Sequence, residues 1–176
     1  YFTGETAKIL GEKKSAGGFG AAPVMFQFGY QFEKQYLTNG NFQALFEFVP
    51  MITGLEQGVF IPSITLMNGL RGNRGGFEFA FGPTFSAVTT SQGFYEEGVW
   101  HQKSEWNDST FTAPGVFETR LDSRGSVSIH PSFVFAIGKT MRFGNLNMPV
   151  NAYFVPGRDG ARFGLSLGYN VRNRKK

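Results

Sequence analysis

The stretch VMFQFGYQF, residues 24–32, alternates between apolar and polar side chains without a break. One set of positions carries Val, Phe, Phe, Tyr and Phe, and the other carries Met, Gln, Gly and Gln. A period of two is typical of an extended strand whose two faces meet different surroundings. The stretch therefore predicts a β-strand, and it raises the question of which face meets water.

The same alternation recurs in six later segments. They are residues 42–50, 60–68, 77–87, 127–138, 146–154 and 162–171. No segment keeps a convincing helical period, and turn sequences such as TNGN at 38–41 and PGRDG at 156–160 separate the segments. The chain is therefore predicted to be an all-β protein.

Length and composition restrict the class further. At 176 residues, the chain (1–176) is expected to fold as one domain. It contains no Cys, which excludes a disulfide framework and a thiolate metal site. The net charge of +4 rests on the basic tail RNRKK at 172–176, and no aromatic-plus-basic pattern accompanies that tail. We therefore expect no nucleic-acid partner.

The number of strands favours a barrel. Seven strands lie beyond residue 22, and the weak strand candidate YFTGETAKIL at 1–10 would supply an eighth. With eight up-and-down strands, the short turns fall at one end together with both termini, and the longer connections fall at the other. The longest connection is a polar stretch at about 89–124. The predicted fold is an eight-stranded antiparallel up-and-down transmembrane β-barrel with one long external loop.

The composition of the polar face indicates where that face points. A soluble barrel would carry many Lys, Glu and Arg on its outward positions. Here the polar face is mainly Gln, Ser, Thr, Asn, Gly and Ala, and the only charges in the strand segments are Glu47, Glu78 and Arg162. We therefore expect the apolar face to contact lipid and the polar face to fill a narrow lumen. Five strand prolines count against this and favour a soluble sandwich: Pro50, Pro62, Pro83, Pro131 and Pro149.

The alternating strands, the long external loop and the closing FGLSLGYNV at 163–171 resemble the small eight-stranded outer-membrane barrels of the OmpA, OmpX and OmpW kind. The Phe-rich strands and the Tyr–Asn ending are similar to small outer-membrane barrels of Bacteroidota. The resemblance covers nearly the whole chain, but here a basic tail follows Tyr169. It implies a place in the cell outer membrane of a Gram-negative bacterium, surrounded by membrane lipid and lipopolysaccharide, and no specific activity.

His130 and Ser132 are the sharpest catalytic candidates. IHPSF at 129–133 places them on one face of a strand, and this resembles the His-x-Ser pair of outer-membrane lipid A deacylases. In those enzymes the pair faces lipid, whereas the alternation here places both side chains in the lumen. Ile129 and Phe133 also replace that family's flanking Arg and Asn. With no orienting acid evident, a hydrogen-bonded lumen histidine is the favoured interpretation.

The three strand charges are the next candidates. Glu47 and Glu78 on inward faces could act as a general acid and base. Charges inside a narrow barrel more often pair, because an unpaired buried charge is costly. We therefore expect a structural lumen network in which Arg162 bridges one or both acids.

The long loop carries aromatic residues of the kinds enriched at binding hot spots, namely Tyr95, Trp100 and Trp106. We expect them to anchor a partner or cell-surface ligand, or else to pack the loop against the barrel mouth. The loop acids and His101 lack the spacing of a calcium loop, so no metal or cofactor is expected. Those acids are Glu96, Glu97, Glu105 and Asp108.

Three functions remain open at this point. The favoured one is a non-enzymatic outer-membrane barrel that acts as a structural or binding component, as an accessory subunit of a larger outer-membrane complex. The second is an envelope lipid-modifying enzyme that uses His130 and Ser132. The third is a carrier of a small apolar ligand with the aromatic face turned inward.

Overall fold

The computed structural model describes residues 1–73, 75–107, 116–143 and 146–171. Within these ranges, one α-helix, α1 (Gly4–Gly11), and three short 3₁₀-helices, η1 (Lys14–Ala16), η2 (Leu55–Gln57) and η3 (Lys103–Glu105), accompany the strands. The strands are β1 (Gln27–Gly29), β2 (Phe32–Asn39), β3 (Phe42–Thr53), β4 (Ile61–Gly72), β5 (Phe77–Glu96), β6 (Val99–Gln102), β7 (Glu118–Leu121), β8 (Ser126–Phe143), β9 (Leu146–Val155), β10 (Arg162–Leu167) and β11 (Asn170–Val171). The all-β prediction is confirmed.

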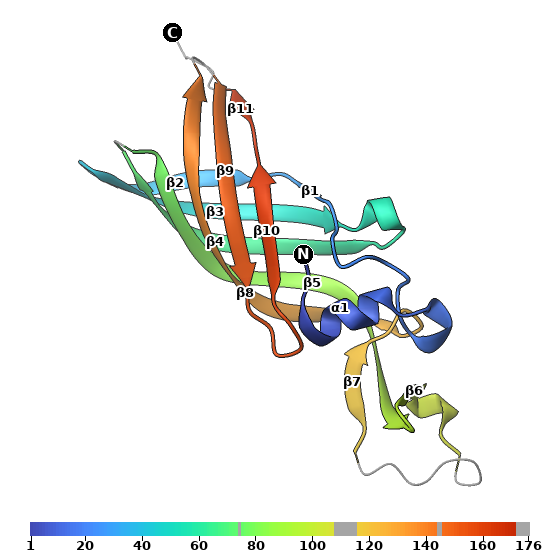
Figure 1. The fold of residues 1–176 in the computed structure, drawn as a ribbon. Coiled ribbons are helices and arrows are strands. Elements are labelled where there is room, and N and C mark those ends of the chain that lie inside the picture. Colours follow the sequence, from blue (N-terminus) through green and yellow to red (C-terminus); the bar gives the residue numbers. More distant parts are fainter. Residues whose placement is uncertain (74, 108–115, 144–145, 172–176) are drawn as a thin grey trace.

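The strands form one antiparallel sheet with the order β1-β3-β4-β5-β8-β9-β10. β2 continues the β1 edge along β3, and β11 continues the β10 edge along β9. The sheet curls strongly, so that it encloses about half of a barrel (Figure 1). When the short strands β2, β6 and β7 are set aside, each strand of this order lies beside the one that follows it in the chain, which is the up-and-down order predicted from the turns. No helix in the described parts of the chain is both long enough and apolar enough to span a membrane.

The opening stretch shows which face points outward. Phe26 and Phe28 are 66% and 64% exposed on the outer face of the curled sheet. Gln27, between them, points inward and donates a hydrogen bond to Thr53 Oγ1 at 2.8 Å. The same parity holds on the other long strands, where the exposed residues include Phe46, Ile64, Phe79, Phe81, Phe85, Ile129, Phe133, Phe135, Ile137, Phe163 and Leu165. The predicted outward aromatic face is confirmed.

The inner face is lined by small polar side chains. Thr65 and Thr84 are buried there and share a hydrogen bond of 2.7 Å between their hydroxyl oxygens. Ser63 and Ser86 are also buried. Successive side chains of a strand point to opposite faces. When the Phe side chains lie on the outer face, the Ser and Thr side chains between them therefore lie on the inner face.

The prolines fit the sheet with little disturbance. Pro50 and Pro62 lie in the continuous β3–β4 register, and Pro50 still accepts a hydrogen bond from the amide of Tyr30 at 3.1 Å. The β4–β5 pairing is interrupted opposite Pro83, where Leu66 and Met67 have no paired β5 residue. The proline pattern therefore does not prevent a curled antiparallel sheet.

The N-terminal segment differs from the prediction. Residues 1–10 were expected as a strand, but Gly4–Gly11 form α1, and only Phe2 makes a β-bridge, to Arg162 at the start of β10. The helix forms because Ile9 and Leu10 become buried beneath it, next to the segment of Phe19 and Ala21, and this tertiary burial outweighs its short length. The first residues thus lie at the opposite end of the sheet from β11, so the prediction that both termini share one end is wrong (Figure 1).

The predicted long loop at 89–124 is also partly wrong. β5 continues to Glu96, and a two-residue turn with positive φ at Glu97 (50°) and Gly98 (80°) leads into β6. Both β6 and β7 pair with the end of β5, and we call this three-stranded extension, residues 90–107 and 116–124, the arm. It projects from the end of the sheet that holds α1 (Figure 1). Residues 108–115 lie outside the described part of the chain.

Candidate functional site

The inner wall carries a charged network near the end of the sheet opposite α1. Arg71 Nε lies 2.6 Å from Glu78 Oε1, and Arg71 Nη1 donates to Glu33 Oε1 at 2.7 Å. Thr140 Oγ1 also donates to Glu78 Oε1, at 2.5 Å. Glu47 is only 4% exposed and is paired in register with Glu33 on the neighbouring strand. Three carboxylates and one guanidinium thus gather on this wall.

The network includes Glu78 as expected, but its cation is Arg71. Arg162 lies at the start of β10 and forms no ion pair with any described acid; its guanidinium carbon is 5.8 Å from the centre of the Phe2 ring. Sequence reasoning placed Arg71 in a turn and stopped the first strand before Glu33. Both residues continue the inward parity of their strands, and this alternation could have identified them.

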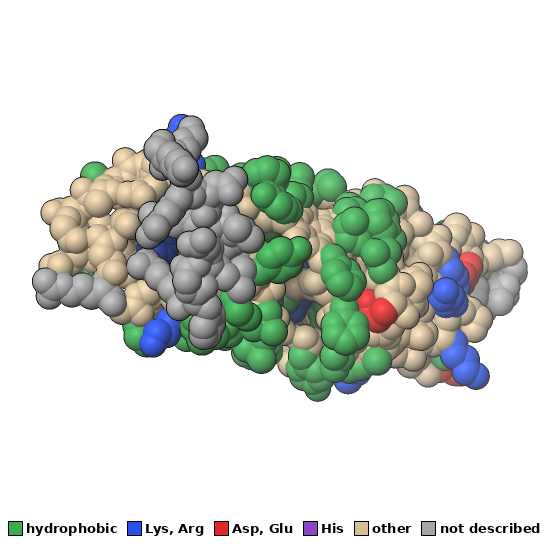
Figure 2. Space-filling model, turned by 90° about the horizontal axis from the view of Figure 1, so that it is seen from above, with side chains coloured by type: hydrophobic (Ala, Val, Ile, Leu, Met, Phe, Trp, Pro, Cys, Tyr) green, Lys and Arg blue, Asp and Glu red, His purple; other side chains and the backbone are tan. Residues whose placement is uncertain are grey.

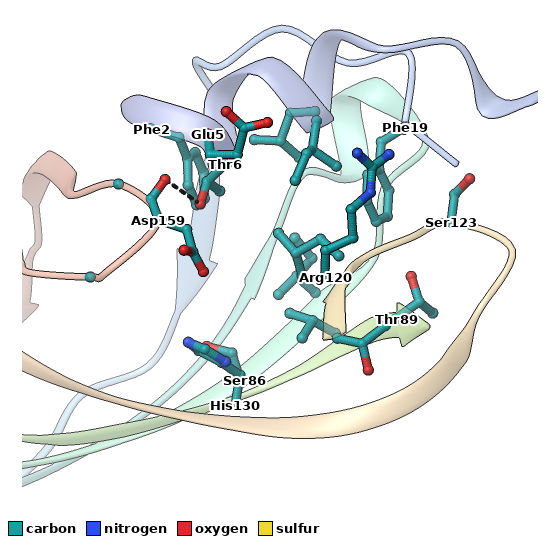
Figure 3. Close-up of a pocket in the computed structure, with 18 of the residues that line it drawn as sticks. Phe2, Glu5, Thr6, Phe19, Ser86, Thr89, Arg120, Ser123, His130 and Asp159 are labelled. Atoms are coloured by element: carbon teal, nitrogen blue, oxygen red, sulfur yellow. Dashed lines mark hydrogen bonds between the residues drawn. The ribbon is translucent and has the colours of Figure 1, made fainter. Parts of the chain in front are cut away.

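A cavity of about 990 Å³ lies between α1 and the inner face of the sheet. α1 and the segment after it supply an apolar roof with Ile9, Leu10 and Phe19. The opposite wall carries Ser86 of β5 and His130 of β8, which are partners on adjacent strands. Both lie across the cavity from the helix (Figure 3). The β9–β10 loop closes one side, where Thr6 donates to the backbone oxygen of Asp159 at 3.4 Å.

The candidate pair His130 and Ser132 lies on this cavity wall, inside the sheet as the alternation predicted. Their strand partners are Ser86 and Thr84. Within the described residues, no hydrogen bond joins His130 to Ser132, and no carboxylate pairs with His130. The structure thus gives a hydroxyl-lined wall with an imidazole, to which no acid of the described segments is paired as it would be in a catalytic histidine.

Asp122 is the polar centre of the arm. Its side chain is fully buried, and its Oδ2 accepts hydrogen bonds from Trp100 Nε1 at 2.8 Å and Ser91 Oγ at 2.9 Å. Its Oδ1 accepts from the backbone amide of Arg124 at 2.8 Å, and the Arg124 guanidinium lies 3.1 Å from Oδ2. Burial alone would raise the pKa of Asp122, but these donors outweigh it and hold the pKa well below its usual range.

Arg120 ties the arm to the N-terminal segment. Its Nη2 lies 2.7 Å from Glu12 Oε2, and its Nη1 donates to the Tyr95 hydroxyl at 2.7 Å. The guanidinium carbon also lies 4.6 Å from the centre of the Trp100 ring, a cation–π distance. Ser123 adds a backbone hydrogen bond to Gly17 at 2.9 Å. The arm, the N-terminal segment and the roof of the cavity are therefore one connected unit.

The three predicted binding residues differ in exposure. Trp100 is 5% exposed and packs within the arm, whereas Trp106 is 36% and Tyr95 is 47% exposed. Sequence reasoning missed Asp122 and Arg120, which hold Trp100 in place. A buried Trp needs a partner for its N–H, and an acid in the same loop was the available clue.

In the described parts of the chain, no three His, Asp or Glu side chains are arranged so that they could hold a metal ion. His101 Nδ1 lies 3.3 Å from Glu105 Oε2. Asp108, the fourth loop acid, lies outside the described residues. No family model, curated protein or solved structure matches the chain.

Proposed function

We propose that the protein is an integral β-barrel of the bacterial outer membrane and acts there as a non-enzymatic structural and binding component, as an accessory subunit of a larger membrane complex. The outward aromatic face of the curled sheet carries this proposal. Soluble monomers rarely expose contiguous apolar patches larger than a few hundred Å². Here hydrophobic side chains gather across the middle of the molecule, over successive strands (Figure 2).

The distribution of charge supports a membrane position. Arg71, Glu33 and Glu78 pair on the inner wall, and the arm and N-terminal segment hold the ion pairs Arg120–Glu12 and Arg124–Asp122. Since a charge facing hydrocarbon is costly, such a protein is expected to keep its charges inside or at the rims. The surrounding lipid and lipopolysaccharide are the partners that this outer face fits.

We further propose that the sheet closes into an eight-stranded barrel with residues 1–3 at the seam. On one side, Tyr1 accepts a hydrogen bond from the Phe163 amide and Thr3 donates one to Ala161, each at 2.9 Å. On the other side, Phe2 donates to Pro23 at 2.8 Å. Inside the curl, the Tyr153 hydroxyl donates to the Gln27 side chain, which connects β9 with β1. These contacts bring the two edges together at the end near α1.

The arm supports a binding role at the rim. It projects beyond the sheet and exposes Tyr95, Trp106, Val116 and Phe117. Aromatic side chains on a projecting element are common anchors for protein partners. The enzymatic alternative has less support, because His130 and Ser132 face the cavity instead of lipid and have no acidic partner within the described residues.

Fractionation tests the membrane assignment. The native protein should enter the detergent phase, remain in the membrane after an alkaline wash and sediment with outer-membrane markers. A closed barrel should also migrate differently in SDS before and after boiling, because it has no open edge for the denaturant. Recovery in the aqueous phase, with identical migration of the two samples, would contradict the proposal.

A further inference from the structure

The cavity under α1 combines two chemistries. Ile9 and Leu10 of the helix make its roof apolar, and Val59 and Val155 add buried apolar side chains to the rest of the lining. Its floor carries the hydroxyl of Ser86 and the imidazole of His130 (Figure 3). A volume of about 990 Å³ is at the upper end of small-molecule sites, roughly 300–1,000 Å³. Apolar walls hold water poorly, so such a space favours an occupant with an apolar body.

Arg162 supplies the charge in this cavity. Its side chain lines the cavity, and its Nε is buried without a hydrogen-bond partner among the described residues. Phe2 covers the guanidinium on one side, and no described carboxylate lies within ion-pairing distance. An uncompensated guanidinium in a partly dry site is costly, and a carboxylate that pairs with it through two parallel hydrogen bonds relieves that cost.

The other charges of the lining are placed differently. Arg120 and Arg124 are paired with Glu12 and Asp122, and Glu5 lies 3.1 Å from Lys8. The remaining charged groups of the lining are exposed, so water screens them: Lys14, Glu118, Arg158 and Asp159. Among the described charged groups of the lining, Arg162 is therefore the cation that is neither paired with a carboxylate nor exposed.

We propose that this cavity binds a single-chain amphiphile with a carboxylate head, the chain lying between α1 and the inner wall and the head paired with Arg162. Ser86 and His130, on the floor of the cavity, offer further hydrogen-bonding groups to the bound amphiphile. An amphiphile with the same hydrocarbon chain but a neutral or cationic head group would make the apolar contacts and would not form the ion pair with Arg162. The site thus selects for the head group as well as for the chain.

Nuclear magnetic resonance of dodecanoate labelled with ¹³C at the carboxyl tests the proposal directly. The full-length protein is prepared in a nonionic detergent, so that micelle-dissolved and protein-bound dodecanoate give separate carboxyl signals. The bound signal should titrate about 1 to 3 pH units below the micellar one, because the guanidinium stabilises the carboxylate. Dodecanol and dodecyltrimethylammonium should displace it at least about tenfold less effectively than unlabelled dodecanoate.

Two variants locate the head group. Arg162→Gln should abolish the bound signal that titrates at low pH, whereas Arg158→Gln, which removes an exposed arginine of the lining, should retain it. If Arg162→Gln fails to fold, the competition by dodecanol and dodecyltrimethylammonium on the unmodified protein still tests whether the site selects a carboxylate head. Absence of a bound signal, equal displacement by all three head groups, or loss of the signal in Arg158→Gln alone would overturn the proposal. The test is made in detergent solution, so its outcome does not depend on whether the protein resides in the outer membrane.

Discussion

Trp100 donates the hydrogen bond of its indole to Asp122, with Nε1 2.8 Å from Oδ2. Both side chains are buried; Trp100 belongs to β6, and Asp122 directly follows β7. The same carboxylate contacts Ser91 of β5 and Arg124. Asp122 therefore holds the three strands of the arm together, and the arm in turn holds the roof of the cavity through Arg120 and Glu12.

Removing the Asp122 carboxylate should loosen the arm. In a Trp106→Phe background Trp100 is the sole tryptophan, because the chain has two. Asp122→Ala should shift its emission to the red and lower the stability of the arm by about 3 kcal/mol, since several charge-assisted hydrogen bonds are lost together. Ser91→Ala, which removes one donor, should have a much smaller effect. Unchanged emission in Asp122→Ala would show that packing alone holds Trp100.

The pH dependence of the arm follows from the depressed pKa of Asp122. A carboxyl whose pKa is lower in the folded protein stabilises the fold above its unfolded pKa, about 3.9, and that stability is lost as the pH falls through the folded value. Trp100 emission should therefore stay constant on acidification past pH 4 and change only well below it. A transition centred near pH 4 would mean that Arg124 and Trp100 do not stabilise the carboxylate.

A pair of glycines tests the contact between the N-terminal segment and the arm. Gly17 has a φ of +87°, and a Cβ there would lie 2.8 Å from Asp122 Oδ2. Gly20 has a φ of +62°, but a Cβ there meets nothing within 4 Å. Both Ala substitutions carry the backbone penalty of about 1 kcal/mol, whereas only Gly17→Ala also displaces Asp122. Limited proteolysis should therefore cut the N-terminal segment faster in Gly17→Ala; equal rates in the two variants would exclude a tight contact.

The inner-wall network predicts opposite results for two substitutions. Arg71→Met leaves Glu33 and Glu78 without their cation and should lower the free energy of unfolding by about 3 to 5 kcal/mol. Glu47→Gln keeps the shape and removes one of three neighbouring acids, so it should be neutral or stabilising. Urea titration of both variants in lipid vesicles measures the difference. A larger loss of unfolding free energy in Glu47→Gln than in Arg71→Met would mean that Glu47, and not the ion pairs of Arg71, stabilises this wall.

The residues that sequence analysis placed correctly share a local cause. The outward Phe28 and the inward Gln27, His130 and Ser132 follow from alternation alone, which depends only on the strand that carries them. The α-helix at Gly4–Gly11 could not be found in this way, because its burial depends on a cavity formed by distant strands. Nor could the pairing of Arg71 with Glu33, since the two residues are brought together by β3, which lies between their strands.

The central claim is that the outward apolar side chains contact lipid, and site-directed spin labelling along β8 tests it most directly. The chain has no native cysteine, so single cysteines at 133, 134, 135, 136 and 137 can each be labelled without a background. Collisions with oxygen, which concentrates in lipid, and with a water-soluble nickel chelate are measured in lipid vesicles. Labels at Phe133, Phe135 and Ile137 should show high oxygen and low nickel accessibility, and those at Val134 and Ala136 should show low oxygen accessibility. High nickel accessibility at the three outward positions would contradict the account.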